Sequence, residues 1–178
     1  MEDILNKDIL MVNDKSELRK GDIILASIKD NGISVYAELL KDPYDEVDSP
    51  GEVVTKYEIG NFFIIESKGD EYRRVPLNKN SKIIEEDKVN LIPIKGMILS
   101  LLGFIPDERV KVYGRKTHET YKRYQHNIGY VLEHYDKVWR LTYPEDSNSN
   151  EARLVVEKLI YVHQLQHALR ECEKMDER

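Results

Sequence analysis

Two histidines stand four residues apart near the end of the chain, in the stretch IYVHQLQHALREC, Ile160 to Cys172. In a helix, residues i and i+4 are surface neighbours, so His163 and His167 could approach one metal ion. A zinc site needs three or four protein ligands, however, and the stretch lacks the glutamate of the HExxH motif, while Glu171 lies about 12 Å along the helix axis from His163. We therefore predict no metal and no other cofactor, and we expect Ile160, His163 and His167 to form an exposed polar flank that contacts a partner.

The stretch RVKVYGRKTHETYKRYQH, residues 109–126, combines positive charge with aromatic rings. Six basic residues stand against the single acid Glu119. Positive charge binds phosphate and tyrosine rings stack on bases, so the composition favours a nucleotide or a nucleic-acid single strand. The alternative is a solvated hairpin, because strand alternation would separate its basic groups onto two faces. The candidate ligand-binding residues are Arg109, Lys111, Tyr113, Arg115, Lys116, Tyr121, Lys122, Arg123 and Tyr124.

Acid and base groups are available, but no catalytic motif is visible. The chain has no GxSxG elbow, no GxxxxGK[ST] phosphate loop, no GxGxxG and no CxxC pair. Its histidines all lie in the second half, and His134 and His163 are the first to test for a small hydrolase, since alternation in IGYVLEHY can place His134 on a sheet face covered by the last helix. We assign no catalytic residue and keep a histidine-dependent hydrolase as an alternative.

Charge and composition limit the class of protein. Residues 1–93 hold 13 Lys and Arg against 20 Asp and Glu, a balance of −7, whereas residues 94–178 hold 14 against 13, a balance of +1. The acidic first half argues against nucleic-acid binding over the whole surface. The single cysteine, Cys172, indicates a reducing compartment, and we find no signal-peptide pattern and no apolar run of the roughly 18 residues that a membrane helix needs. We therefore expect a soluble, cytoplasmic protein without a membrane partner.

Short strands are the predicted elements of the first half. Apolar and polar residues alternate in ISVYAEL and EVVTKYEI, whereas DIILASI and NFFIIES are apolar on both faces. Asn31-Gly32 is a hairpin signal between two of them. The segment 43–51 interrupts the series with two prolines and several acids, which lack the spacing of an EF-hand loop, so we predict a solvated loop there. Such a series predicts a small antiparallel, SH3-like β-barrel.

The second half is predicted to run helix, sheet, helix. A short buried helix over 95–102 is followed by a C-cap glycine at Gly103 and by Pro106. The segments VKVYG, ETYKRYQH, IGYVLEHY and DKVWRLTY then predict an antiparallel meander. We expect the last helix to begin after DSNSN, with Ser149 or Asn150 as N-cap. At 100° per residue, its face toward the meander consists of Leu154, Tyr161, Val162, Leu165, Ala168, Leu169 and Cys172.

The expected fold class is therefore α+β. A small antiparallel (SH3-like) β-barrel over residues 1–93 is followed, over residues 94–178, by a unit of helix, meander and helix that packs closely on the first.

Three segments carry a resemblance to known proteins. In order, SELRKGDII, LIPIKGMILSLLGF and IYVHQLQHAL resemble an uncharacterised family encoded by Bacteroidetes genomes, their prophages and phages, whose members have an ELRxGN-like opening, a PIPLTEEILLKxGF-like helix and a KYVHQLQNL-like final helix. This chain departs at Gly96, where the pattern has an acid, and at His167, where it has asparagine. The second departure argues against a metal site that needs both histidines. The resemblance implies a phage or mobile-element accessory protein and implies no activity.

Three functions follow as hypotheses. We predict a non-enzymatic protein-interaction module whose partner is a host or phage protein, because small barrels commonly serve this role and no catalytic motif is visible. The first alternative is a binder of a nucleotide or single-stranded nucleic acid through residues 109–126, with sequestration of a host immune-signalling nucleotide as one form of it. The second alternative is the small hydrolase.

Overall fold

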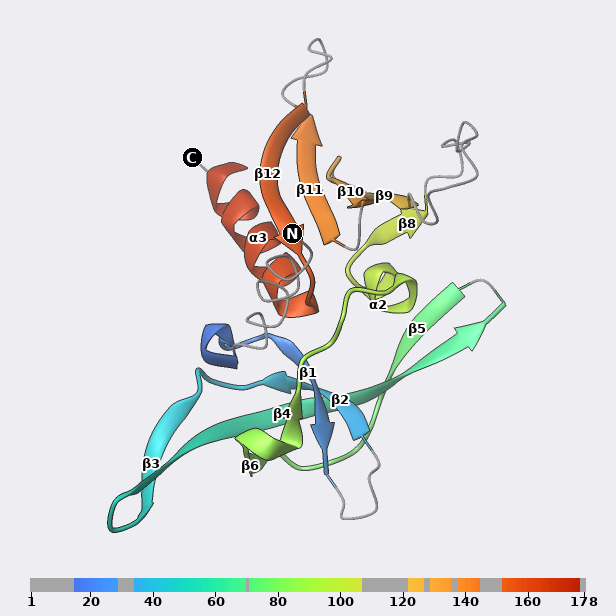
Figure 1. Ribbon diagram of the computed structural model, residues 1–178. Helices are drawn as coiled ribbons and strands as arrows, with labels where there is room; N and C mark the ends of the chain where they lie inside the picture. The colour runs from blue at the N-terminus through green and yellow to red at the C-terminus, as the bar shows by residue number, and fades with distance from the viewer. Residues whose placement is uncertain are drawn as a thin grey trace, which may run out of the picture. The chain divides into compact units, whose positions relative to one another are not determined.

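The computed structural model describes residues 15–28, 34–69, 71–106, 122–126, 129–135, 138–144 and 152–176. The chain divides into two compact units, which are taken in turn (Figure 1). Unit 1 consists of Met1–Ile64 and Pro76–Ile92, and unit 2 of Ile65–Val75 and Pro93–Arg178. No helix in the described ranges has the length and apolar character required to cross a membrane.

Unit 1 is built on an antiparallel sheet. Strand β4 pairs with β2, β2 with β1, and β1 with β7, while β3 and β6 also pair with β4. The hairpin predicted at Asn31-Gly32 lies outside the described residues, although β1 and β2 do pair as expected. The elements are η1 (Lys15–Glu17), β1 (Ile23–Ser27), β2 (Ser34–Leu39), β3 (Tyr44–Ser49), β4 (Glu52–Lys68), β6 (Lys82–Glu85), η2 (Glu86–Lys88) and β7 (Val89–Asn90).

The core of unit 1 follows the alternation seen in the sequence. In β2, Val35, Ala37 and Leu39 are buried while the residues between them are not, as predicted. They pack with buried side chains of the neighbouring strands and of the turn before β1. This cluster consists of Leu18, Ile24, Ala26, Val35, Ala37, Leu39, Tyr57, Ile59, Phe62 and Val89.

One predicted loop of unit 1 is a strand. The solvated loop expected over residues 43–51 is wrong, because Tyr44–Ser49 forms β3 and pairs in register with β4. Pro50 and Gly51 occupy the turn between the two strands, and Gly51 has φ 92°. Proline favours the second position of a type II turn and glycine the third, where φ is positive. The residues interpreted as strand breakers therefore make the turn of a hairpin.

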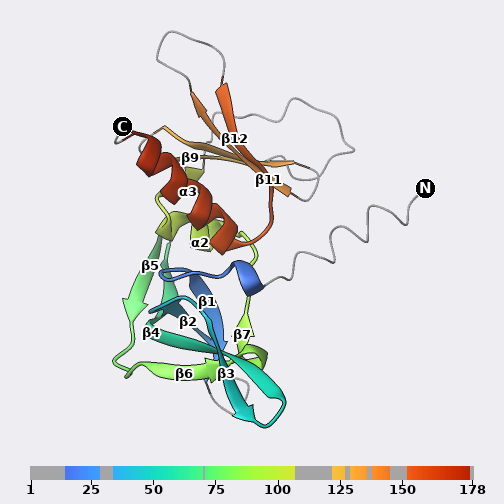
Figure 2. The same cartoon turned by 90° about the vertical axis from the view of Figure 1, so that its left-hand side faces the viewer.

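Unit 2 contains a second antiparallel sheet, with the strand order β12-β11-β10-β9-β8, and two helices (Figure 2). Helix α2 ends at Leu101, and Gly103, two residues further on, has the φ of 81° expected of the predicted glycine after the helix end. The elements are β5 (Glu71–Pro76), α2 (Gly96–Leu101), β8 (Phe104–Pro106), β9 (Lys122–His126), β10 (Val131–Tyr135), β11 (Val138–Pro144), β12 (Ala152–Leu159) and α3 (Val162–Asp176).

The predicted start of the last helix is wrong. Residues Ala152–Leu159 form β12, which pairs with β11, and α3 begins only at Val162. The side-chain Oε1 of Gln164 accepts hydrogen bonds from the backbone N–H groups of Ile160 and Tyr161, at 2.9 and 3.1 Å, and so fixes the helix start. Within α3 the predicted inner face is confirmed at Val162, Leu165, Ala168 and Cys172, which are buried, and α3 contacts β12. Leu154 belongs to the strand instead.

The α+β class is confirmed by these antiparallel sheets and helices. The SH3-like identity of the first sheet, the meander as predicted and the close packing of the two halves stay predictions.

Candidate functional site

The predicted nucleotide-binding stretch falls mostly outside the described residues. Arg109, Lys111, Tyr113, Arg115, Lys116 and Tyr121 all lie there. Lys122, Arg123 and Tyr124 belong to β9, whose backbone pairs Arg123 with Glu133 of β10. The strand predicted in this part of the chain is therefore confirmed, and the binding site remains a prediction.

The polar flank predicted on the last helix is not exposed. His163 is 2% exposed, and Ile160 and His167 are half-buried. The ring of His163 stacks on Tyr161 at 5.9 Å between centroids and meets the edge of His167 at 5.8 Å. The chain at Pro93 and Ile94 runs beside this turn, where Ile94 N–H donates to the carbonyl of Ile160 and Pro93 forms a β-bridge with Tyr161. The prediction of an exposed His163 is wrong, because its side chain is buried and its ring packs against Tyr161 and His167.

Two further histidines, His126 and His134, also lie against rings, whereas His118 is outside the described residues. His134 and Trp139 are cross-strand partners with centroids 4.6 Å apart, and His126 packs between Phe104 and Tyr130. Among the described residues, no three His, Cys, Asp or Glu side chains come together to form a possible metal site. The ring contacts of the described histidines indicate that these side chains pack against their neighbours.

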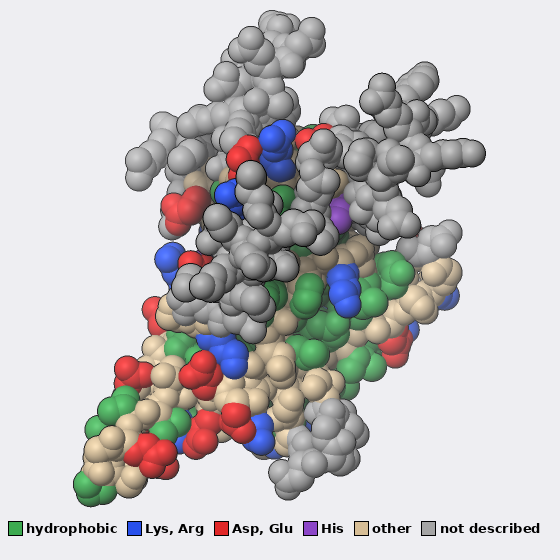
Figure 3. All heavy atoms as spheres, in the orientation of Figure 1, with side chains coloured by type: hydrophobic (Ala, Val, Ile, Leu, Met, Phe, Trp, Pro, Cys, Tyr) green, Lys and Arg blue, Asp and Glu red, His purple; other side chains and the backbone are tan. Residues whose placement is uncertain are grey.

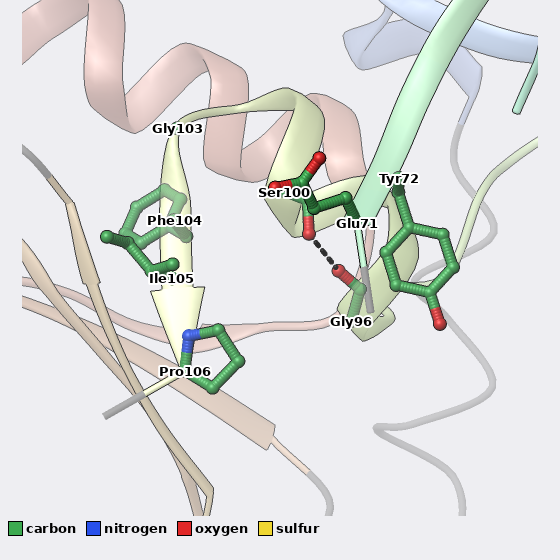
Figure 4. Close-up of a pocket in the computed structure, with 8 residues that line it drawn as sticks. All are labelled: Glu71, Tyr72, Gly96, Ser100, Gly103, Phe104, Ile105 and Pro106. Atoms are coloured by element: carbon green, nitrogen blue, oxygen red, sulfur yellow. Dashed lines mark hydrogen bonds between the residues drawn. The ribbon is translucent and has the colours of Figure 1, made fainter. Parts of the chain in front are cut away.

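A pocket of about 530 Å³ lies in unit 2, between β5, α2 and β8 (Figure 4). Its wall mixes polar and apolar groups, and of its apolar residues Phe104 is buried and Ile105 is exposed. The hydroxyl of Ser100 donates to the carbonyl of Gly96, in its own helix, at 3.4 Å. Glu71 is the charged residue of the lining. One carboxylate without a facing base does not form an acid–base pair, so the pocket offers packing surface and no evident chemistry.

The clearest surface feature is the hairpin of β3 and β4 in unit 1 (Figure 1). Its strands pair from Tyr44 with Lys56 to Ser49 with Glu52, with a register shift beside the Pro50-Gly51 turn. We define the hairpin surface as Asp45, Glu46, Val47, Asp48, Glu52 and Val53.

Two valines make the apolar part of the hairpin surface. Val47 and Val53 are cross-strand partners, and they are 70% and 64% exposed. On β4 the face that carries Val53 continues through Thr55 to Tyr57 and Ile59, which are buried. The face of β4 that is buried in the core of unit 1 thus continues into the hairpin, where it is exposed to solvent. The two valines on this face can be contacted by another molecule.

Acids surround the valines (Figure 3). Asp45 accepts a hydrogen bond from the hydroxyl of Thr55 at 2.8 Å, and Glu52 accepts one from Ser49 at 3.1 Å. Glu46 and Asp48 form no ion pair within the described part of the chain. Residues 42–52 contain five acids and no Lys or Arg. The surface is therefore apolar at its centre and negative around it.

A buried lysine holds the base of the hairpin. The ammonium of Lys56, a residue only 9% exposed, lies 2.8 Å from the Glu85 carboxylate of β6. This hydrogen bond raises the pKa of Lys56 above its ordinary value, against the opposing effect of desolvation, and Glu85, Asp48 and Glu46 add a Coulombic contribution. Because Lys56 is engaged by Glu85, it leaves the charges of Glu46 and Asp48 only partly compensated.

Sequence reasoning missed this surface. The available signal was Pro50-Gly51 between YDEVDS and EVVTKYEI, two runs that can pair across a tight turn. The acids of the first run are poor strand formers and pointed to a loop instead.

Comparisons with protein-family models, with curated proteins and with solved structures return no match.

Proposed function

We propose that the protein is a non-enzymatic interaction module of phage or mobile-element origin, which binds a host or phage protein through the hairpin surface. The observation that carries the proposal is the solvent-exposed Val47–Val53 pair on a hairpin whose Glu46 and Asp48 form no ion pair among the described residues. Apolar side chains inside a polar rim are the usual arrangement of a protein-binding surface. The small size of unit 1 and its SH3-like interpretation agree with this role by analogy.

The site differs from the one expected on the last helix. A partner that reached His163 would have to displace Tyr161 and His167 from its ring, whereas Val47 and Val53 can be reached without any rearrangement. Interfaces that form between preorganised surfaces avoid such a cost. We therefore place the partner on the hairpin surface.

A retention experiment with the full chain tests the proposal. The wild-type protein, the double variant Val47→Asp/Val53→Asp and the control Ile83→Asp are immobilised, and proteins retained from host-cell lysate are identified. Ile83 is an apolar residue of β6 in the same unit and is 58% exposed, so the control places one aspartate at an exposed apolar position elsewhere. We expect a protein that binds the wild type and the control and is lost with the double variant. Direct titration with that purified protein must reproduce the difference, and a partner retained equally by all three proteins would contradict the proposed site.

A second candidate function is favoured by the sequence of residues 109–126. Its six basic residues and three tyrosines suit a nucleotide or a nucleic-acid single strand, including an immune-signalling nucleotide sequestered from the host. A thermal-shift screen against nucleotides and short single strands tests it.

A further inference from the structure

No strand of the described residues pairs with the outer side of β3. Strand β1 pairs with β2 from Ser27 with Ser34 to Ile23 with Glu38, so its pairing ends before β3 begins. The backbone N–H of Leu40 donates to the carbonyl of Glu58 in β4. The chain after β2 thus stays beside β4 on its way toward Tyr44, the first residue of β3. In the described ranges, β4 is the only strand that pairs with β3. One side of β3 therefore presents backbone groups to solvent.

These backbone groups form a template for another strand. In an antiparallel pair, every second residue directs its N–H and C=O away from its partner, so about half of the six residues of β3 offer such groups on the open side. Five of the six residues are exposed. An extended segment of another protein can add to such an edge through main-chain hydrogen bonds, with its side chains deciding specificity.

The side chains of β3 set the chemistry of that segment. Asp45 and Val47 project on one face of the sheet, the face that carries Val53, and Glu46 projects on the other. A strand beside β3 therefore meets an acid on either face and an apolar residue between them. Lys or Arg residues next to Asp45, Glu46 and Asp48, with a β-branched residue next to Val47, would complement every position, because opposite charges and apolar pairs stabilise adjacent strands.

A second copy of the chain does not fit this edge. Pairing β3 with another β3 would bring Asp45, Glu46 and Asp48 against the same acids, and like charges on neighbouring strands destabilise their pairing. The charge of the edge thus selects a positive partner and opposes self-association.

We infer that β3 accepts a basic, extended segment of the partner protein as an additional strand, with a Val or Ile side chain beside Val47. This inference rests on the proposed function and specifies how the hairpin surface is used. The acids of β3 select a positively charged segment, and backbone hydrogen bonds hold that segment as a strand.

The test measures the binding of a short labelled peptide, which has a single Lys-Lys-Val-Lys core, to the full-length protein by fluorescence anisotropy. Two further peptides carry N-methyl groups on alternate residues, one on the odd set and one on the even set. N-methylation removes the N–H groups of one side of a strand, so strand addition requires that one methylated peptide binds and the other does not. A Glu-Glu-Val peptide of equal length is the charge control.

Variants of the protein locate the peptide. Val47→Thr keeps the shape and the β-branched character, and should weaken binding about fourfold through the loss of one methyl group. Glu46→Gln/Asp48→Asn should weaken it about fivefold. Glu86→Gln/Asp87→Asn removes the same charge from η2 in the same unit and should leave binding unchanged. Circular dichroism and thermal unfolding confirm that each variant is folded.

The outcomes separate the inference from the proposed function. Binding of the Lys-Lys-Val peptide that one methylated set abolishes, and that the Glu46/Asp48 variant weakens, supports strand addition. Equal binding of both methylated peptides, or equal losses in the η2 control, overturns it. Absence of peptide binding, together with a lysate protein that still depends on Val47 and Val53, overturns the basic strand and leaves the proposed function in place. Loss of both signals overturns both.

Discussion

The β3–β4 hairpin and helix α3 show opposite relations between sequence and exposure. The hairpin has two prolines nearby and five acids, yet it is a paired strand that exposes two valines. Helix α3 has two histidines at helical spacing, yet one of them is almost completely buried. Side-chain polarity predicted the opposite in both places. The difference teaches that exposure here depends on which backbone segments pair, and that pairing connects residues far apart in the sequence.

The three segments from which a resemblance to phage-encoded proteins was predicted help to build the fold. In ELRKGD, Leu18 is in the core, and the Asp22 carboxylate accepts the backbone N–H of Arg19 at 2.8 Å. In the central segment Gly103 follows the end of α2, and in the last one Gln164 fixes the start of α3. The hairpin surface lies outside all three segments. We therefore expect α3 to govern stability and the hairpin to govern binding, and the following variants test that division.

The largest effect on stability is expected from Leu165→Ala in α3. Leu165 is fully buried, and truncating such a leucine leaves a cavity that costs about 3 kcal/mol of the free energy of unfolding. Val53→Ala on the hairpin should change it by less than about 0.5 kcal/mol. Urea denaturation measures both. Equal losses would show that Val53 contributes to stability as much as Leu165 does. They would contradict the assignment of stability to α3 and of binding to the hairpin.

Gln164→Ala should have an intermediate effect. It removes the acceptor for the N–H groups of Ile160 and Tyr161, so we expect a loss of about 1 kcal/mol in the free energy of unfolding. Glu173→Gln, at an exposed position of the same helix, is the matched control. If Gln164→Ala and the control are equally stable, Gln164 does not determine where α3 begins.

A smaller effect is expected from the lysine at the base of the hairpin. The folded protein holds the Lys56 proton more tightly than the unfolded chain does, because the bond to Glu85 raises the pKa of Lys56 above 10.5. Its stabilising contribution is therefore fully present below pH 10.5 and is lost as the pH rises through the raised pKa. Relative to Lys56→Met, the wild type should lose stability between pH 10 and 12 in denaturation curves. Parallel pH profiles for the two proteins would rule out this contribution.

No effect is expected from nucleotides if the hairpin surface is the binding site. A ligand present at about 100 times its dissociation constant would add roughly 2.7 kcal/mol of stability, which a thermal-shift screen resolves easily. A shift that Arg115→Ala/Lys122→Ala/Arg123→Ala abolishes would instead favour the second candidate function.

Local patterns predicted part of this structure. The alternation in ISVYAEL identified the buried face of β2, and Gly103 marked the end of α2, because both depend on neighbours in the chain. Strand β12 was mistaken for helix, since ARLVVEKL has apolar residues at spacings that fit either element, and its pairing with β11 decides between them.

The candidate site was less predictable than the fold. The turn before α3, at Ile160 and Tyr161, pairs with Pro93 and Ile94, about 70 residues earlier in the chain. The openness of β3 depends on where β1 stops pairing with β2. Both are tertiary facts that no short window of sequence contains.

The most direct measurement is the affinity of the partner retained from host-cell lysate, determined by titration calorimetry for the wild type, Val47→Asp/Val53→Asp and Ile83→Asp. We predict that the double variant binds at least about tenfold more weakly, as expected when central interface side chains are lost, and that Ile83→Asp binds like the wild type. Thermal unfolding must show that all three proteins are folded at the temperature of the titration. Equal affinity of the double variant and the wild type would contradict the assignment of binding to the hairpin surface.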